Sequence, residues 1–268
     1  MSENQLSNNK NLDSSSSFLV IGDIALVNLK NENEIDRGKE LAEKILRVNK
    51  YIKSVYGKIG TEGEFRVPKI IHLLGEKKTE TIAKEYGLLF YVDISKVYYN
   101  PRLAEEHHYI SQISEDGEVV LDLFSGIGGF SIHLAAAKRA IVFANDINPY
   151  AIKFLNASVL LNKKKIIGEV IASNLEANKL LLMMSKKAKF DRIIMNNPTM
   201  IEGFLQNVNA VVKTGTTLHI YALIVKDKLE EKVKGIASLI KSSRIDYIKE
   251  AIEYSPSKSI YRIDISVQ

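Results

Sequence analysis

The chain of 268 residues contains no cysteine and no long uninterrupted apolar segment. Without cysteine it can have no disulfide framework, no thiolate nucleophile and no cysteine-ligated zinc site. It has no apolar run of about eighteen residues, and its N-terminus is polar rather than basic and then apolar. The sequence therefore predicts neither a membrane-spanning helix nor a secretory signal. We expect a globular cytoplasmic protein with no membrane partner.

The composition leaves room for one large or two modest domains. Hydrophobic residues make up 46% of the chain, and 37 basic residues against 32 acidic ones give a net charge of +5. This balance permits nucleic-acid binding without requiring it.

Three segments differ in pattern. Residues 1–17 are rich in asparagine and serine and predict a disordered tail. Residues 18–112 predict a small α+β domain on the substrate side, with an amphipathic helix over 34–47 and a short helix over 79–86. In residues 113–268 strands and helices alternate, which predicts an α/β, Rossmann-like domain with a mostly parallel sheet. Two strand patterns at the end would add an antiparallel edge, as in methyltransferase folds.

The stretch 119–149 organises the last domain. Its apolar start predicts a buried parallel strand that ends in Asp122. A glycine-rich turn over 125–129 follows, then an apolar helix, and then a second strand that ends before Asp146. Glycines let the backbone approach a ligand, and an acid in this place can accept both hydroxyls of a ribose. The unit therefore predicts a site for an adenosine-containing cofactor.

The loop indicates which cofactor this is. Dinucleotide folds carry G-x-G-x-x-G and bind the pyrophosphate at the helix N-terminus, whereas this loop reads DLFSGIGGF and starts with Asp122. A carboxylate there would repel a pyrophosphate but can hold the ammonium group of a methionine moiety. S-adenosylmethionine therefore fits better than NAD. Taken alone, the loop could also be an ordinary glycine turn.

Polar segments also follow the later strands, at 173–174 and 196–198. Ligands of open α/β sheets bind at the carboxyl ends of the strands. Asn196 and the backbone up to Pro198 can accept hydrogen bonds from a planar, nitrogen-bearing substrate beside the reactive methyl. The alternative is a plain strand end, because proline stops strands and asparagine favours turns.

In combination, these motifs resemble the archaeal and eukaryotic tRNA (guanine-37-N1)-methyltransferase family. Its acid-F-[AS]-G-x-G loop, D-I-N-P turn and N-L-P motif correspond to DLFSGIG at 122–128, DINP at 146–149 and NNP at 196–198. Earlier segments are similar too: GDIALV at 22–27, GEFRVP at 63–68 and YYNPRLAEE at 98–106. The resemblance spans nearly everything from residue 18 onward. It implies methyl transfer from S-adenosylmethionine to N1 of guanosine 37, next to a tRNA anticodon.

The resemblance also implies roles for single residues. Glu106 would remove the proton from guanine N1, and Arg66 would stabilise the charge that develops on O6. These residue types suit the chemistry, because N1 is protonated at neutral pH and a sulfonium methyl is already activated. The residues implied as catalytic are Glu106, Arg66, Asn196, Pro198 and Tyr98. Those implied to bind the cofactor are His107, Asp122, Phe124, Ser125, Gly126, Gly128, Asp146, Ile147, Asn174, Leu175 and Asn196.

The chain departs from the family at His107, Asn174 and Asn197, which stand where the family has arginine, an acid and leucine. The family's extra N-terminal module, which senses the outer corner of tRNA, is expected to be missing. Two alternatives stay open. One is a related wyosine-pathway enzyme that transfers an aminocarboxypropyl group or methylates a tricyclic guanosine derivative. The other is a catalytically weak tRNA-binding relative.

For partners, we expect a monomer that binds the anticodon stem-loop of tRNA. We expect no metal ion, because the adjacent His107 and His108 lack the i, i+4 spacing of helical zinc ligands.

Overall fold

The computed structural model describes residues 18–63, 65 and 67–268, and the chain divides into two compact units. The first unit consists of the described residues up to Ala83 together with Val92–Pro101. The second consists of Lys84–Tyr91 and Arg102–Gln268. The predicted disordered tail, 1–17, lies outside the described residues.

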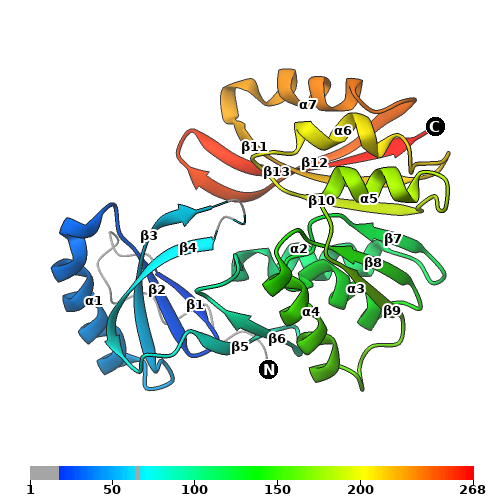
Figure 1. Ribbon diagram of the computed structural model, residues 1–268. Helices are drawn as coiled ribbons and strands as arrows, with labels where there is room; N and C mark the ends of the chain where they lie inside the picture. The colour runs from blue at the N-terminus through cyan, green and yellow to red at the C-terminus, as the bar shows by residue number, and fades with distance from the viewer. Residues whose placement is uncertain (1–17, 64, 66) are drawn as a thin grey trace. The chain divides into compact units, whose positions relative to one another are not determined.

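The first unit is built on a four-stranded sheet with the order β1-β2-β3-β4, which Figure 1 shows in blue and cyan. Its strands are β1 (Phe18–Ile21), β2 (Ile24–Asn28), β3 (Ser54–Glu62) and β4 (Val67–Gly75). Strands β2 and β3 are parallel, and the other pairs are antiparallel. A 3-10 turn, η1 (Glu32–Glu34), leads into helix α1 (Ile35–Val48). The helix buries Ala42 and Ile45 in the same apolar cluster as Val55 and Leu73 of the sheet, as its amphipathic pattern predicts.

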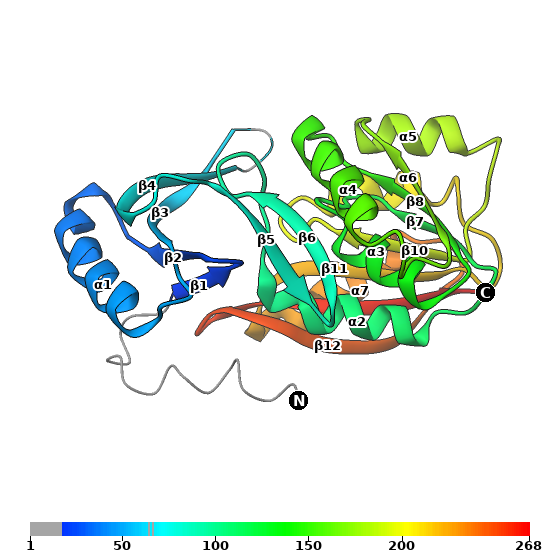
Figure 2. The same cartoon turned by 90° about the horizontal axis from the view of Figure 1, so that it is seen from below.

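A two-stranded ribbon of β5 (Glu80–Glu85) and β6 (Leu88–Asp93) follows, and Figure 2 shows the two strands side by side. The short helix predicted over 79–86 is therefore wrong. Burial alternates along β5, with Thr81, Ala83 and Glu85 buried, which is the period of a strand. Tyr86 (φ 45°) and Gly87 (φ 85°) form the two-residue turn, and hairpins of type I′ require positive φ at both central residues. Pairing in the hairpin overrides the helical propensity of alanine, glutamate and lysine.

The second unit contains a seven-stranded sheet with the order β12-β13-β11-β10-β7-β8-β9. The five strands β11, β10, β7, β8 and β9 are parallel to one another. At the other edge of the sheet, β13 pairs antiparallel with both β11 and β12. The strands are β7 (Val119–Asp122), β8 (Ile141–Asn145), β9 (Glu169–Ser173), β10 (Arg192–Asn196), β11 (Thr217–Val225), β12 (Ser243–Ser255) and β13 (Lys258–Val267). The predicted Rossmann-like α/β fold with an antiparallel edge is confirmed.

Helices cover both faces of this sheet (Figure 1). One apolar cluster joins the sheet to α5 (Ala177–Met184), α6 (Glu202–Val208) and α7 (Leu229–Ser238). A second cluster joins it to α2 (Ala104–Ile113) and α3 (Gly129–Ala137). The remaining helical segments are η2 (Pro101–Leu103), α4 (Pro149–Leu161) and η3 (Lys226–Lys228). Within 18–63, 65 and 67–268, no helix is both long and apolar enough to cross a membrane.

The two units do not divide at residue 112, where the sequence placed the domain boundary. Helix α2 belongs to the second unit, because Ile110 is fully buried in one cluster with Phe130 and Leu134 of α3. The division also passes through both strands of the β5–β6 hairpin. Glu106 on α2 therefore belongs to the same unit as the strand ends.

Candidate active site

The carboxyl ends of four parallel strands meet at one edge of the seven-stranded sheet. The residues that end them are Asp122 of β7, Asn145 of β8, Ser173 of β9 and Asn196 of β10. Strand order reverses between β7 and β10, and ligands of open α/β sheets bind in the crevice at such a reversal. The glycine-rich loop, Asp146 and the Asn-Asn-Pro segment, which the sequence analysis connected with the cofactor and the substrate, all lie at these strand ends.

The loop after β7 takes its shape from two glycines. Gly126 (φ 54°) and Gly128 (φ 94°) have left-handed backbone conformations, which residues with a Cβ rarely adopt. A Cβ on Gly128 would also lie 3.0 Å from Ile132 Cδ1. The Ser125 amide donates to the Asn145 carbonyl at 2.7 Å, so the loop is held against the end of β8.

Asp122 is fully buried at the start of this loop. Its Oδ2 accepts a hydrogen bond from Ser131 Oγ at 2.6 Å. Among the described residues, neither its Oδ1 nor the buried Ser125 Oγ has a hydrogen-bond partner. Burial raises the pKa of Asp122 to about 7, against the lowering effect of the Ser131 hydrogen bond. Two polar atoms without partners at a buried point fit a ligand that carries a cationic hydrogen-bond donor.

Asp146 stands at the end of β8, where the ribose acid was predicted. Its Oδ2 accepts from the Gly126 amide at 2.8 Å, and its Oδ1 accepts from the Asn148 amide at 2.9 Å. Burial raises its pKa, and the two backbone hydrogen bonds oppose that rise. Asn174 Nδ2 donates to the carbonyls of Asp146 and Ile147 at 2.7 and 2.8 Å. Asn174 thus fixes the backbone of the segment that follows β8.

Asn145 joins three strand ends, and the sequence analysis missed it. Its Nδ2 donates to the Leu123 carbonyl at 3.3 Å and to the Leu175 carbonyl at 3.0 Å. Its Oδ1 accepts from Ser173 Oγ at 2.8 Å and from the Leu175 amide at 3.1 Å. The only sequence signal for Asn145 was an amide at the end of an apolar strand.

The predicted cofactor residue Phe124 packs edge-on against Phe204, with ring centroids 4.9 Å apart.

The Asn-Asn-Pro segment follows β10 beside the switch in strand order. Asn196 and Pro198 are half-buried. Asn196 pairs with Tyr221 of β11 in the parallel register, and the Pro198 carbonyl accepts from the Leu223 amide at 2.8 Å. Both predicted residues are therefore anchored to β11.

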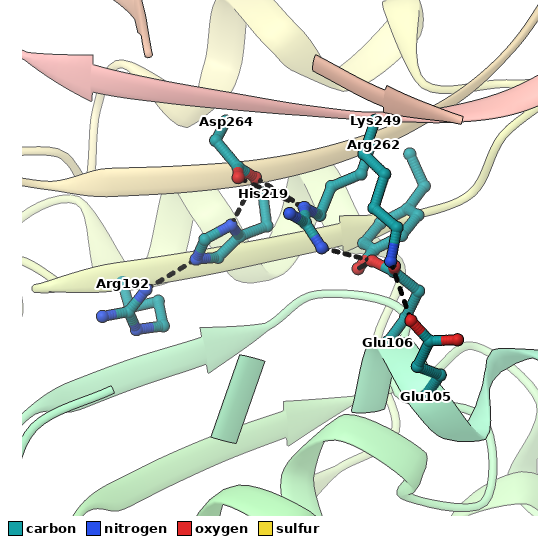
Figure 3. A network of polar contacts seen from close by, with 8 residues as sticks. Glu105, Glu106, Arg192, His219, Lys249, Arg262 and Asp264 are labelled. Atoms are coloured by element: carbon teal, nitrogen blue, oxygen red, sulfur yellow. Dashed lines mark hydrogen bonds and ion pairs between the residues drawn. The ribbon is translucent and has the colours of Figure 1, made fainter. Parts of the chain in front are cut away.

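Glu106 lies on α2 and points toward the antiparallel edge of the sheet (Figure 3). Only 2% of it is exposed. Its Oε2 accepts from Arg262 Nη1 at 2.6 Å and from Tyr221 Oη at 3.0 Å, while Lys249 Nζ lies 2.9 Å from Oε1. Burial would raise the pKa of Glu106, but the close ion pair with Lys249 and the charge and hydrogen bond of Arg262 hold it below its usual value. Among the described residues, Oε1 itself has no hydrogen-bond partner. The carboxylate is thus ionised and fixed.

Glu106 is one end of a longer polar chain in Figure 3. Arg262 Nε donates to Asp264, and Asp264 Oδ1 lies 2.7 Å from His219 Nδ1. Arg192 Nη1 lies 2.6 Å from His219 Nε2. Because arginine only donates, Nε2 of His219 must accept and Nδ1 must carry the proton. Burial lowers the pKa of His219, which agrees with a neutral ring.

His107, predicted to bind the cofactor, lies buried beneath the start of α3. Its Nδ1 lies 2.8 Å from Glu85 Oε2, and His133 Nε2 lies 3.1 Å from the same oxygen. The three atoms lie within 4.8 Å of one another, and the hydrogen bonds of the two histidine rings to the Glu85 carboxylate account for this contact. The sequence analysis tested a metal site only for the adjacent His107 and His108. Glu85 and His133 lie on other elements, far from His107 in the sequence.

Two predicted catalytic residues remain, Tyr98 and Arg66. Tyr98 belongs to the first unit, is 46% exposed, and has Lys58 Nζ 5.4 Å from its ring centroid. Arg66 lies outside the described residues, so its predicted role stays a prediction.

The fold and the strand ends define a class I, Rossmann-like methyltransferase. The family comparison agrees: a model of the TRM5/TYW2 methyltransferase domain matches residues 81–248, and one of the TYW2 N-terminal domain matches residues 1–79. The chain belongs to the TRM5/TYW2 methyltransferase family.

Similar proteins carry two kinds of names. The chain is 39% identical over 206 residues to tRNA (guanine(37)-N(1))-methyltransferase Trm5b of Pyrococcus abyssi, covering 76% of this chain and 59% of that protein. It is 29% identical over 248 residues to tRNA 4-demethylwyosine(37)-methyltransferase Taw21 of Saccharolobus solfataricus, covering 92% of each. The chain thus spans well under two thirds of the first relative's length and most of the second's.

Solved structures of relatives agree with the fold. Trm5 of Methanocaldococcus jannaschii in complex with adenosine matches with a TM-score of 0.80 at 29% identity, covering 94% of this chain and 74% of that one. A complex of aTrm5 with tRNALeu matches with a TM-score of 0.79 at 29% identity, covering 94% and 72%.

Proposed function

We propose that this chain transfers a methyl group from S-adenosylmethionine to N1 of guanosine 37 in tRNA. The observation that carries the proposal is the 39% identity to a Trm5b enzyme across the residues that form the strand ends. The adenosine-bound and tRNA-bound relatives support the choice of cofactor and partner. Since the substrate is tRNA, we expect the enzyme to act in the cytoplasm.

The residues at the strand ends fit S-adenosylmethionine. Asp122 and Ser125 offer buried oxygen atoms that have no partner among the described residues, and these suit the amino group of the methionine moiety. Asp146 suits the ribose hydroxyls, with its backbone fixed by Asn174. When bound, the cofactor supplies a methyl group already activated by the sulfonium.

In the proposed reaction, Glu106 accepts the proton of guanine N1. It is ionised at neutral pH, which this role requires. Asn196 and the backbone to Pro198 hold the edge of the base, Arg66 stabilises the charge on O6, and Tyr98 contacts the base.

The test is incubation of the protein with an unmodified tRNA transcript and S-adenosylmethionine, followed by mass spectrometry of the nucleosides. One methyl group on guanosine 37 is the expected product. A transcript with adenosine at position 37 is the matched control and should stay unmethylated. Methylation of both transcripts, or of neither, would contradict the proposal.

A wyosine-pathway reaction is a second candidate, and one observation favours it. The N-terminal match is to the TYW2 domain, and the chain covers 92% of Taw21 but 59% of Trm5b. A tRNA that already carries 4-demethylwyosine separates the reactions by product mass, because methyl transfer adds far less mass than aminocarboxypropyl transfer. Reaction of this tRNA but not of the unmodified transcript would favour the second candidate.

A further inference from the structure

The chemistry proposed for Glu106 meets a physical obstacle. The side chain is almost completely buried, at 2% exposure, and burial alone favours the protonated form of a carboxylic acid. A protonated Glu106 could not accept the proton of guanine N1. Some neighbouring group must therefore keep this buried carboxylate ionised.

Charged and titratable groups of three strands, together with its own helix, surround Glu106. Arg262 of β13 and Lys249 of β12 are cations, Tyr221 of β11 donates through its hydroxyl, and Glu105 precedes it on α2. Asp264 accepts a hydrogen bond from Arg262 Nε. Tyr221 brings no charge, since burial raises its pKa well above the usual value and keeps it protonated. The two cations remain as the groups that can hold the carboxylate ionised.

Of these two cations, Arg262 is built into the fold. Its side chain is 1% exposed, whereas that of Lys249 is 32% exposed and also contacts the exposed Glu105. The Arg262 guanidinium carbon lies 4.4 Å from the centroid of the Tyr109 ring, on the same helix as Glu106. A guanidinium stays protonated in proteins, so it cannot itself take up the proton.

A second row of contacts fixes Arg262. Its Nε lies 3.1 and 3.2 Å from the two oxygens of Asp264. Asp264 in turn binds His219, its cross-strand partner on β11, and His219 binds Arg192. Arg192 forms two hydrogen bonds to Glu118, at 2.8 and 2.7 Å. Acceptors and donors thus alternate along this series of hydrogen bonds, from Glu118, which directly precedes β7, to Glu106.

We propose that Arg262 is the positioning residue of the catalytic base: it orients the Glu106 carboxylate and keeps it unprotonated, and the Asp264–His219–Arg192 chain holds Arg262 in place. The proposal rests on the proposed methyl transfer. It adds a residue on the last strand, 156 positions from Glu106 in the sequence.

Methyl transfer under single-turnover conditions, measured against pH, tests the proposal. Arg262→Gln should lower the rate at pH 7 by ~100-fold and move the acid limb of the profile upward by about one pH unit or more. Arg262→Lys should restore the position of the limb and part of the rate. Arg244, an exposed arginine that pairs with Asp246 on the same hairpin, gives the control Arg244→Gln, which should leave rate and profile unchanged.

Asp264→Asn separates orientation from charge. It keeps the Arg262 charge but weakens its anchor, so the rate should fall while the acid limb does not move upward. S-adenosylmethionine affinity and the thermal melting curve serve as folding controls for each variant. If Asp264→Asn keeps the full rate, or Arg262→Gln keeps the wild-type profile, the proposal is wrong.

A second measurement does not depend on activity. In protein labelled with ¹³C at the glutamate side-chain carboxyl, the Glu106 signal is assigned by its loss in Glu106→Gln and is followed against pH. Its midpoint should rise in Arg262→Gln relative to the wild type, and an unmoved midpoint overturns the charge-setting role. If the wild type makes no methylguanosine, the proposed function fails, while this titration still decides whether Arg262 holds Glu106 ionised.

Discussion

Two buried carboxylates of the second unit, Asp122 at the end of β7 and Glu106 on α2, differ in their protonation. Asp122 is 0% exposed and Glu106 is 2% exposed. The pKa of Asp122 rises to about 7, mainly through burial, with one hydroxyl donor opposing the rise. The pKa of Glu106 stays below its usual value, because two cations and a phenol outweigh its burial.

The difference shows how strongly neighbouring cations and hydrogen-bond donors affect the protonation of a buried acid. Asp122 has an oxygen without a partner among the described residues and gains from an arriving cation. Glu106 already has its cations, which come from the protein itself. The charge beside Asp122 would thus come from a ligand, and the charges beside Glu106 come from the protein, although Glu106 Oε1 also has no hydrogen-bond partner among the described residues.

The largest expected effect comes from Glu106→Gln, which removes the carboxylate proposed as the catalytic base. Methyl transfer should fall by ~10²–10⁴-fold, because the amide cannot accept the N1 proton. The affinity for S-adenosylmethionine should be unchanged, because Asp122 and the glycine loop are untouched. Single-turnover kinetics and calorimetric titration measure the two quantities. Turnover equal to that of the wild type would remove Glu106 from the role of base.

Asp122→Asn should weaken the part of the site that is proposed to bind the cofactor and leave the contacts of Glu106 intact. We expect S-adenosylmethionine affinity to fall by ~10–100-fold at pH 8, the range of a lost charge-assisted hydrogen bond of about 1.5–3 kcal/mol. In the wild type, affinity should rise as pH increases through about 7, because only the ionised Asp122 attracts an ammonium group. Calorimetry across pH 5.5–8.5 checks both. An affinity that is flat with pH in the wild type would contradict the assignment.

The same substitution should stabilise the ligand-free protein. The folded-state pKa of Asp122 lies above the usual 3.8, so the folded state binds the proton more tightly than the unfolded state. Stability therefore falls as pH rises from about 4 to about 7 and does not recover above that. Asparagine avoids this cost. Melting of Asp122→Asn at pH 8 should therefore occur a few degrees above the wild type, while at pH 4 the two should be similar.

The loop around Asp122 and Asp146 was largely predictable from the sequence, and the contacts of Glu106 were not. Asp122 ends one apolar strand and Asp146 directly follows the next. With the glycines between them they lie within about 25 consecutive residues, so local patterns locate them. The partners of Glu106 depend on which strands become neighbours. Arg262 lies beside Tyr221 and Lys249 only because β13 pairs with both β11 and β12. The alternation of Arg262 and Asp264 in an apolar strand was the one local signal.

The helix predicted over 79–86 failed for a related reason. Its residues favour a helix when taken alone, but the turn at Tyr86 and Gly87 pairs β5 with β6. That strand puts Glu85 beside His107 and His133. The contact joins three elements and has no counterpart in any short motif.

Gly129→Ala should disturb the junction between these histidines and the cofactor loop. Its Cβ would lie 2.4 Å from His107 Cε1, and the ring cannot move freely because Glu85 holds its Nδ1. We expect a loss of ~1–3 kcal/mol of stability. The control is Gly235→Ala in α7, where a Cβ meets no described atom within 4 Å and where alanine should stabilise by up to ~1 kcal/mol. Chemical denaturation measures both, and equal stabilities would show that the His107 ring can yield.

Lys249→Ala should have the smallest effect and should separate the two cations of Glu106. Lys249 is 32% exposed and shares its charge with Glu105, so solvent and salt screen its contribution. We expect a ~2–5-fold loss of rate, equivalent to less than about 1 kcal/mol, and a small upward shift of the acid limb. Lys226→Ala removes a comparable exposed ion pair with Glu253 on the same hairpin and should leave the rate unchanged. If Lys249→Ala instead matches the loss of Arg262→Gln, the exposed lysine and not the buried arginine holds the base ionised.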